Sequence, residues 1–202
     1  MVKGGRLMRL VPVLVLAAAA FVPAFGQSKY SNKLAPYVTS PQRVVEKMLE
    51  MAAVKSNETV FDLGCGDGRV LFTAVQKYRA KAVGVEIDPK LVESTRAEAQ
   101  KMSMGNRLRV MQGNLLDFDL SEADVVTLYL LTQSNEMLRP RLEKMLHPGA
   151  RVVSYDYAVP GWKPKWVERV EDSNSRAHDH LIYLYEMPPT KDNSSKPSAQ
   201  DE

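Results

Sequence analysis

The chain has 202 residues, of which 45% are hydrophobic and 25% are charged, the size and composition of one globular domain. Its formal charge of +3 comes from three basic residues within positions 1–26, because the remaining 24 basic and 24 acidic residues balance. A neutral folded part lacks the basic surface on which general nucleic-acid binding depends, so no nucleic acid is expected as a partner. Cys65 is the single cysteine, which excludes an intramolecular disulfide.

Residues 1–26 have the layout of a secretory signal peptide, with a basic start, an apolar run and small residues at the end of the segment. This layout predicts cleavage after Gly26 and an exported or periplasmic protein. Residues 10–25 contain two prolines and fall short of the roughly 20 residues that cross a bilayer. An uncleaved anchor that contacts the membrane through this run is the first alternative. The second alternative is a mis-assigned start codon or a leader without a function.

Residues 27–187 are expected to form the folded domain, in which helices and strands alternate. The first helix is expected to be capped by Ser40, to carry Pro41 in its first turn and to reach about Val54. Further helices are expected at about 69–78, 89–104 (capped by Asp88) and 133–146, and strands at 59–63, 81–87, 108–112, 124–130 and 150–157. Strands that alternate with helices pair in parallel through right-handed crossovers. The sequence therefore predicts an α/β fold with a doubly wound, mostly parallel, Rossmann-like sheet.

The end of the domain departs from this alternation. Trp166–Glu171 and Leu181–Tyr185 are strand-like runs separated by a polar turn, which predicts a terminal antiparallel hairpin. Only eight residues separate the fifth strand from Trp166, so the crossover there is expected to lack a full helix. Residues 188–202 have too little apolar surface to order themselves, and a disordered tail is expected.

The strongest signal lies where the first expected strand passes into a helix, at residues 62–68, which read Asp-Leu-Gly-Cys-Gly-Asp-Gly. In a parallel sheet the ligand crevice lies at the carboxyl ends of the strands. Glycine permits backbone geometry that a β-carbon obstructs, and the N–H groups of the following helix start suit a carboxylate or a phosphate. The dinucleotide-binding fingerprint requires a third glycine three residues after the second, and this chain has Arg69 there. The alternating glycines therefore exclude that fingerprint.

In its acid followed by three alternating glycines, the chain resembles class I S-adenosylmethionine-dependent methyltransferases. The resemblance implies S-adenosyl-L-methionine as the cofactor and a class I methyltransferase fold. At the end of the second expected strand, 22 residues after Gly64, the carboxylate of Glu86 is placed to accept both ribose hydroxyls. A solvated strand end is the alternative for this residue. The cofactor-binding residues expected on this basis are Asp62, Gly64, Cys65, Gly66, Asp67, Gly68, Glu86, Asn114 and Leu115.

Some of these positions have roles that the resemblance alone implies. After the third strand the family usually has an acid that accepts a hydrogen bond from the adenine amino group. This chain has Asn114, whose side-chain oxygen is expected to accept that bond, with Asp117 as the alternative. Asp67 is expected near the methionine portion of the cofactor, unless it serves only as a turn former or helix cap. Cys65 is expected to be a small side chain in the turn rather than a nucleophile.

A narrower resemblance rests on three segments in the same order, Pro36-Tyr37-Val38, residues 62–69 and Pro148-Gly149-Ala150. Over roughly residues 34–160, the chain is similar to the small lysine methyltransferases that include the enzyme acting on the ATP-synthase c subunit and its bacterial relatives. It departs from them in having Thr39-Ser40 where a proline is expected directly after Val38. The resemblance implies a protein substrate with a target lysine.

A lysine nucleophile must lose a proton before an in-line displacement at the methyl group, and a tyrosine hydroxyl can hold the amine and accept its hydrogen bond. Tyr129, at the end of the fourth strand, and Tyr37, on the segment before the first helix, are therefore the expected catalytic residues. Simple packing is the alternative for both. Asp156, Tyr157 and Trp162 are candidates for the substrate side. This chemistry requires no metal.

Two further features of the sequence bear on the choice between three functions. The run His178-Asp179-His180 could place two imidazoles on one face of a strand as metal ligands, but no third ligand is evident and a polar hairpin is favoured. Because little chain is left beyond the core fold, an open cleft for a large substrate is expected. A monomeric protein is also expected. A protein-lysine N-methyltransferase is therefore favoured. A small-molecule N- or O-methyltransferase and a non-catalytic S-adenosylmethionine-binding or exported interaction protein are the alternatives.

Overall fold

Seven strands form one sheet in the part of the chain that the computed structural model describes, which is Met1 with residues 35–171 and 179–192. In chain order the strands are β1 Thr59–Leu63, β2 Lys81–Glu86, β3 Leu108–Gln112, β4 Val125–Leu128, β5 Arg151–Tyr155, β6 Trp166–Val170 and β7 His180–Glu186. Their order in the sheet is β3-β2-β1-β4-β5-β7-β6. The first five strands pair in parallel, and β7 pairs antiparallel with β5 and β6. The predicted fold class is confirmed.

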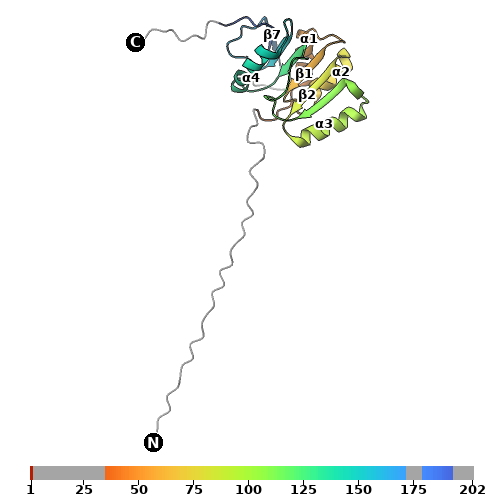
Figure 1. Cartoon of the computed structure of the whole chain (residues 1–202), viewed down its shortest axis with the longest axis vertical. Coiled ribbons are helices and arrows are strands. Elements are labelled where there is room, and N and C mark those ends of the chain that lie inside the picture. Colours follow the sequence, from red (N-terminus) through yellow and green to blue (C-terminus); the bar gives the residue numbers. More distant parts are fainter. Residues whose placement is uncertain (2–34, 172–178, 193–202) are drawn as a thin grey trace.

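Within the described residues, four α-helices cover the two faces of this sheet and give three layers (Figure 1). They are α1 Gln42–Met51, α2 Arg69–Tyr78, α3 Pro89–Lys101 and α4 Thr132–Met145, and a 3₁₀ turn, Gly105–Arg107, precedes β3. Buried side chains of α1, α2 and α3 pack in one hydrophobic cluster. Those of α4 belong to a second cluster on the other face.

The central strands read as almost continuous apolar runs because both faces of the sheet are covered. Successive residues of a strand point to opposite faces. Val60 and Val153 accordingly belong to the cluster with α1–α3, whereas Phe61 and Val152 belong to the cluster with α4. The ends of two strands differ from the prediction. β4 ends at Leu128 and β5 at Tyr155, so the residues that follow them lie in loops at the carboxyl edge of the sheet.

The two predicted helix caps have different outcomes. Asp88 caps α3 as expected, with its side chain accepting the Lys90 N–H at 2.9 Å. The prediction that Ser40 caps α1 is wrong, because Pro41 is the N-cap: its ψ is 140°, and its carbonyl accepts the Val44 N–H. The extended backbone at Pro41 delays the helix start and leaves Ser40 in the preceding segment.

The C-terminal hairpin is as predicted, and no helix lies in the described connection between β5 and β6. Residues 188–192, which fall within the expected disordered tail, pack against the preceding loop. The Lys163 N–H donates to the Thr190 carbonyl at 2.8 Å, and the Asp192 N–H donates to the Gly161 carbonyl at 3.0 Å. Because of these backbone hydrogen bonds, the folded part of the chain extends past residue 187, where the domain was expected to end.

Residues 2–34, 172–178 and 193–202 lie outside the described residues. The leader, most of the polar turn in the hairpin and the rest of the tail therefore stay predictions. Among the described helices, none is long and apolar enough to cross a membrane.

Candidate active site

A cavity of about 870 Å³, partly open to solvent, lies at the carboxyl edge of the sheet. Its walls are the glycine turn after β1, the ends of neighbouring strands with their loops, and the segment 35–40 before α1. All predicted catalytic and cofactor-binding residues except Gly68 line it, namely Tyr37, Asp62, Gly64, Cys65, Gly66, Asp67, Glu86, Asn114, Leu115 and Tyr129. The fold thus gathers these residues around one space.

Gly66 is the point at which the N-terminal segment closes over the turn. Its φ of 52° is left-handed, and a β-carbon there would lie 2.7 Å from Cε2 of Tyr37. At Gly64, with φ of 88°, a β-carbon would lie 3.3 Å from a methyl group of Leu130. Side chains at these positions would fill the space between the glycine turn and the side chains of Tyr37 and Leu130. Close approach of Tyr37 therefore favours glycine at position 66, and the left-handed backbone favours glycine at both positions.

Gly68 does not line the cavity, so its position does not support the predicted contact with a cofactor. It is the N-cap of α2, with φ of 79°, and a β-carbon there would lie 2.4 Å from Cγ2 of Thr95 on α3. Thr95 is 1% exposed and cannot move aside into solvent. Gly68 therefore allows α2 to pack against α3 directly behind the turn.

We expect Gly68→Ala to lower the free energy of unfolding by about 3 kcal/mol, because left-handed backbone costs an alanine roughly 1–2 kcal/mol and overpacking adds roughly 1–3 kcal/mol. Urea denaturation followed by circular dichroism measures this change. Gly149→Ala is the matched control, since Gly149 has φ of 85° and nothing lies within 4 Å of its β-carbon position. If both variants lose the same stability, the contact with Thr95 adds nothing.

The glycine turn uses several of its backbone N–H groups internally. The Gly64 and Cys65 N–H groups donate to the Val85 carbonyl at 2.8 and 3.0 Å, and the Gly68 N–H donates to the Cys65 carbonyl at 2.8 Å. These bonds tie the turn to β2 and to itself. The expectation that an anion binds at the N–H groups of the helix start concerns α2 and stays a prediction. Asp62, Asp67 and Glu86 line the cavity as carboxylic acids around the turn.

Glu86, at the end of β2, has a carboxylate held by three backbone donors. Oε1 accepts the N–H groups of Ile87 at 2.8 Å and Asp88 at 2.9 Å, and Oε2 accepts the Gly66 N–H at 3.0 Å. Glu86 is 7% exposed, so the alternative of a solvated strand end is wrong. Because a carboxylate has about four lone-pair positions, this one is fixed in place and can still accept a hydrogen bond from a ligand hydroxyl.

Asp62, at the end of β1, combines burial with a place in the cavity wall. It accepts a hydrogen bond from the Thr127 hydroxyl at 2.7 Å. Burial raises the pKa of Asp62 to about 7, against the lowering effect of that hydrogen bond, and the charges of Glu86 and Asp67 raise it further. A nearby cation favours the ionised form of such a carboxyl group. The cavity therefore offers a favourable place for the positive charge of a ligand.

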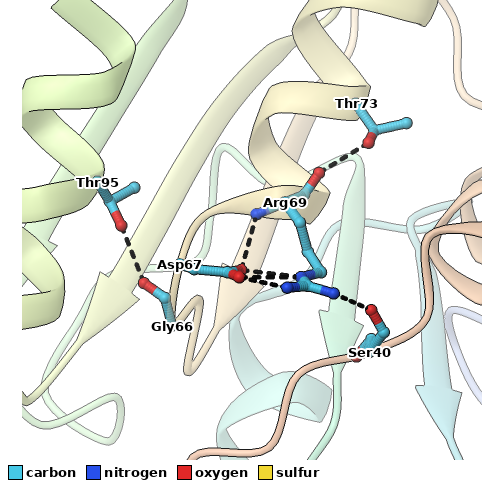
Figure 2. A network of polar contacts seen from close by, with 6 residues as sticks. All are labelled: Ser40, Gly66, Asp67, Arg69, Thr73 and Thr95. Carbon is cyan, nitrogen blue, oxygen red and sulfur yellow. Dashed lines mark hydrogen bonds and ion pairs between the residues drawn. The ribbon is translucent and has the colours of Figure 1, made fainter.

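Figure 2 shows the polar network that joins the glycine turn to the N-terminal segment. The Arg69 guanidinium donates to both carboxylate oxygens of Asp67, from Nε at 2.9 and 3.1 Å, and also to the Ser40 carbonyl. Burial opposes ionisation of Asp67, but the hydrogen bonds and charge of Arg69 hold the pKa of this carboxyl below its ordinary value. Arg69 and Ser40 were not predicted as site residues. A basic residue directly after the glycine turn was the available signal.

Tyr37 belongs to the same network. Burial raises the pKa of Tyr37, and the charge of Asp67 and its hydrogen bond to the tyrosine hydroxyl raise it further. Tyr37 therefore stays neutral and donates to Asp67, while 43% of the residue remains exposed. This position makes Tyr37 a cover over the glycine turn.

The loop after β3 brings Asn114 and Leu115 to the cavity wall. Oδ1 of Asn114 accepts the Leu116 N–H at 3.0 Å, which fixes the amide in its own turn and leaves a second lone pair for a donor. Asp117, the alternative adenine acceptor, is exposed and does not line the cavity. Of the two candidates, Asn114 is therefore the one that the fold places at the site.

Cys65 lines the cavity, but its thiol packs against β2. A β-carbon at Gly84 would lie 2.6 Å from Sγ of Cys65. Burial raises the pKa of Cys65 well above its ordinary value. Because the thiolate is the reactive form, this thiol is unsuited to act as a nucleophile.

Tyr129 lies just past β4, where the cavity meets a cluster of aromatic residues. Its ring centroid is 4.1 Å from that of Tyr155 and 6.4 Å from that of Tyr157. Tyr129 therefore both packs against these rings and lines the cavity.

Trp162 is 2% exposed, donates from Nε1 to Glu143 at 2.7 Å and does not line the cavity. The prediction that Trp162 borders the substrate is not supported by this buried position.

In the described part of the chain, no group of three or more His, Cys, Asp or Glu side chains is arranged to hold a metal ion. His178 lies outside the described residues. His180 contacts Tyr155 and Asp156 on the neighbouring part of the sheet. The prediction for the pair of histidines therefore stays a prediction.

Comparison with known proteins connects this cavity to a family. A model of the ANTKMT methyltransferase domain matches residues 62–166, just over half of the chain. A protein-lysine N-methyltransferase of Saccharolobus islandicus is 48% identical over 151 residues, which cover 74% of this chain and 92% of that protein. The human lysine N-methyltransferase of the ATP-synthase c subunit is 27% identical, over 81% of this chain and 70% of its own length.

A solved structure extends the comparison to the cofactor. The RNA methyltransferase of Salinibacter ruber, crystallised in complex with S-adenosyl-L-homocysteine, is 38% identical, has a TM-score of 0.68 and covers 82% of this chain and 100% of its own. The cavity fits the methylated form of that molecule, with the buried Asp62 to meet a cation and the anchored Glu86 to meet hydroxyls. The chain therefore belongs to the ANTKMT methyltransferase domain family and is an S-adenosylmethionine-dependent methyltransferase.

Proposed function

We propose that this methyltransferase transfers a methyl group to the ε-amino group of a lysine in a protein. The observation that carries the proposal is the charge around the cavity. Of the described residues that line it, Asp62, Asp67 and Glu86 are carboxylic acids, and the one base, Arg69, is paired with Asp67. Because Arg69 is paired, none of these lining residues offers an unpaired base to the phosphates of a nucleic acid. The 48% identical relative, named a protein-lysine N-methyltransferase, supports the same choice.

The residues of the chain would divide the work of an in-line displacement. When bound, S-adenosylmethionine supplies a methyl group on a positively charged sulfur. Glu86 and Asn114 would hold the nucleoside, and Asp62 would lie beside the cationic portion. Tyr37 would shield the glycine turn from water. The protein then mainly has to align the amine, exclude water and remove a proton, and Tyr129, which lines the cavity, would receive the amine.

RNA is the second candidate substrate, because the 38% identical relative of known structure is named an RNA methyltransferase. The acidic cavity wall speaks against it. A small-molecule substrate has less support, since no helical insertion covers the cavity within the described residues. An open cavity suits a side chain that projects from a larger molecule.

The test is incubation of the full chain with methyl-labelled S-adenosylmethionine and a soluble protein extract, a membrane extract or total RNA. We expect label in protein that resists ribonuclease and is recovered as methylated lysine after acid hydrolysis. The Glu86→Ala variant is the control for label that does not depend on the cofactor site. Label in RNA, or in amino acids other than lysine, would contradict the proposal.

A further inference from the structure

Thr127 is the one polar residue of β4, a central strand whose four residues are all buried. A buried hydroxyl costs free energy unless it makes a hydrogen bond. The Thr127 hydroxyl oxygen lies 2.7 Å from Oδ1 of Asp62 and 3.3 Å from the Phe61 carbonyl oxygen. It has one hydrogen to donate, and the carboxylate oxygen is the nearer acceptor. The hydroxyl is therefore directed at Asp62.

The sheet brings these two side chains together. Asp62 on β1 and Thr127 on β4 are partners in the parallel register of neighbouring strands. Strand residues project alternately to the two faces of a sheet, and these two share a face. Because a β-branched side chain has few rotamers, packing fixes the direction of the Thr127 hydroxyl. Thr127 thus holds the carboxylate from a position that does not itself line the cavity.

The two carboxylate oxygens of Asp62 differ in their contacts. Oδ1 accepts the hydrogen bond from Thr127, whereas Oδ2 accepts none from the described residues. The residue is buried within the fold and forms part of the cavity wall. One oxygen is therefore held from behind, and the other is left to meet a ligand.

The hydrogen bond from Thr127 acts on the charge of Asp62 as well as on its direction. Burial raises the pKa of Asp62 to about 7, the Thr127 hydrogen bond lowers it, and the charges of Glu86 and Asp67 raise it. A hydroxyl that donates to a carboxylate favours the ionised form, whereas burial favours the neutral one. Without this hydroxyl, Asp62 would therefore keep its proton to a higher pH.

The other titratable groups of the cavity wall do not neutralise Asp62. Burial raises the pKa values of Cys65, Tyr37 and Tyr129, so these three side chains are uncharged at neutral pH. The guanidinium of Arg69 is paired with Asp67. Within the described cavity wall, no unpaired base therefore faces Asp62, and a cationic ligand would supply the opposite charge.

We propose that Thr127 is a positioning residue for cofactor binding, whose hydroxyl holds the Asp62 carboxylate in the ionised form that meets the cationic portion of S-adenosylmethionine. Binding of the cofactor then displaces a proton from Asp62. The O–H bond of the neutral acid breaks, its electron pair stays on the carboxylate, and the proton passes to a base of the buffer. Thr127 acts through Asp62 and does not touch the cofactor. The proposal does not depend on which molecule is methylated.

The first measurement is calorimetric titration of the full chain with S-adenosylmethionine between pH 6 and pH 8. Thr127→Val keeps the shape of the side chain and removes the hydroxyl. Loss of this hydrogen bond should move the ionisation of Asp62 from about pH 7 to about pH 8. We therefore expect the variant to bind about tenfold more weakly than the wild type at pH 6, and about twofold more weakly at pH 8. The amine of the cofactor titrates alike in both proteins, so the ratio of the two Kd values is compared.

Two further variants separate this role from a purely structural one. Thr127→Ser keeps the hydroxyl and should restore the pH dependence of the wild type. Thr73→Val makes the same chemical change at another buried threonine, whose hydroxyl donates to the Arg69 backbone carbonyl at 2.7 Å, and it should match the wild type. A ratio of Kd values for Thr127→Val that is the same at every pH would overturn the proposal, as would failure of Thr127→Ser to restore the profile.

The second measurement counts the protons that the wild type releases on binding. Titrations at pH 6.5 in two buffers of different ionisation enthalpy give this number. We expect about 0.8 of a proton for each S-adenosylmethionine bound, the fraction of Asp62 that is neutral at this pH. The probe 5′-methylthioadenosine shares the nucleoside but carries neither the ammonium nor the sulfonium charge, and it should release none. Equal release with both ligands, or none with S-adenosylmethionine, would overturn the proposal.

These titrations contain no methyl acceptor, so their outcome is separate from that of the lysine specificity. If no lysine is labelled in extracts, the proposed function fails, and the titrations still decide the role of Thr127. If lysine is labelled and Thr127→Val keeps the pH profile of the wild type, the role of Thr127 alone is wrong. Thr127→Ala is the second variant should Thr127→Val not fold, and it should show the same pH-dependent loss of affinity.

Discussion

Replacing Glu86 with alanine is expected to weaken the binding of S-adenosylmethionine on the order of 100-fold, where 1.4 kcal/mol corresponds to about tenfold in affinity. Backbone N–H groups occupy three of the about four lone-pair positions of the carboxylate, which leaves one for a ribose hydroxyl. A hydrogen bond to a charged group contributes about 1.5–3 kcal/mol, so its loss accounts for a change of this order. Isothermal titration calorimetry of the full chain measures the loss directly.

Glu86→Gln is the matched control, because it keeps the shape of the side chain and removes its charge. Its oxygen can still accept the Ile87 and Asp88 N–H groups, which donate to the glutamate at 2.8 and 2.9 Å. We expect its affinity to fall on the order of tenfold, because a neutral amide oxygen accepts a weaker hydrogen bond than a carboxylate does. Urea unfolding without cofactor separates loss of binding from loss of the fold. Unchanged affinity in Glu86→Ala would leave Glu86 the structural role of tying the glycine turn to β2.

The second large effect expected is a pH-dependent gain in stability on replacing Asp62 with asparagine. Burial raises the pKa of Asp62 from 3.8 to about 7 in the folded protein. Between these two values the folded protein holds a proton that the unfolded chain has lost, so rising pH destabilises the wild type. The loss is complete above pH 7 and amounts to about 4 kcal/mol, at about 1.4 kcal/mol for each pH unit between the two values.

Asparagine does not titrate, so the stability of Asp62→Asn relative to the wild type should rise by about 4 kcal/mol between pH 4 and pH 8. Urea unfolding at a series of pH values measures this difference without cofactor. Asp117→Asn is the control, because it makes the same chemical change at an exposed position in the same domain and should show no such rise. A constant difference between Asp62→Asn and the wild type across this range would show that Asp62 ionises as an ordinary carboxyl group.

Much of the fold followed from local patterns. The central strands were found because a doubly covered sheet needs apolar residues on both faces, which makes short continuous runs such as Thr59–Leu63 easy to recognise. The start of α3 was found because Asp88 and Pro89 carry their capping function within one turn. The start of α1 was missed because the ψ of Pro41, unlike its φ, is not restricted by the ring and is extended here.

The cofactor side of the cavity was predictable for a related reason. The glycine turn and Glu86 each follow a parallel strand, and neighbouring parallel strands bring their carboxyl ends together. The contact of Gly68 with α3 was not predictable, because the alternation of the three glycines does not reveal that Thr95 lies beside it. The burial of Trp162 was not predictable, because an aromatic residue in a loop carries no local signal for a hydrogen bond to Glu143, 19 positions away.

The sequence by itself determined the alternation of strands and helices, the glycine turn and the acid that follows it, because each depends on residues close together in the chain. The tertiary structure alone decided which side chains meet across that frame. Arg69 reaches Ser40 across 29 positions, and Tyr155 reaches His180 across 25. The second contact exists because β7 lies between β5 and β6. Strand order arises from how the whole chain packs, and no local pattern of residues encodes it.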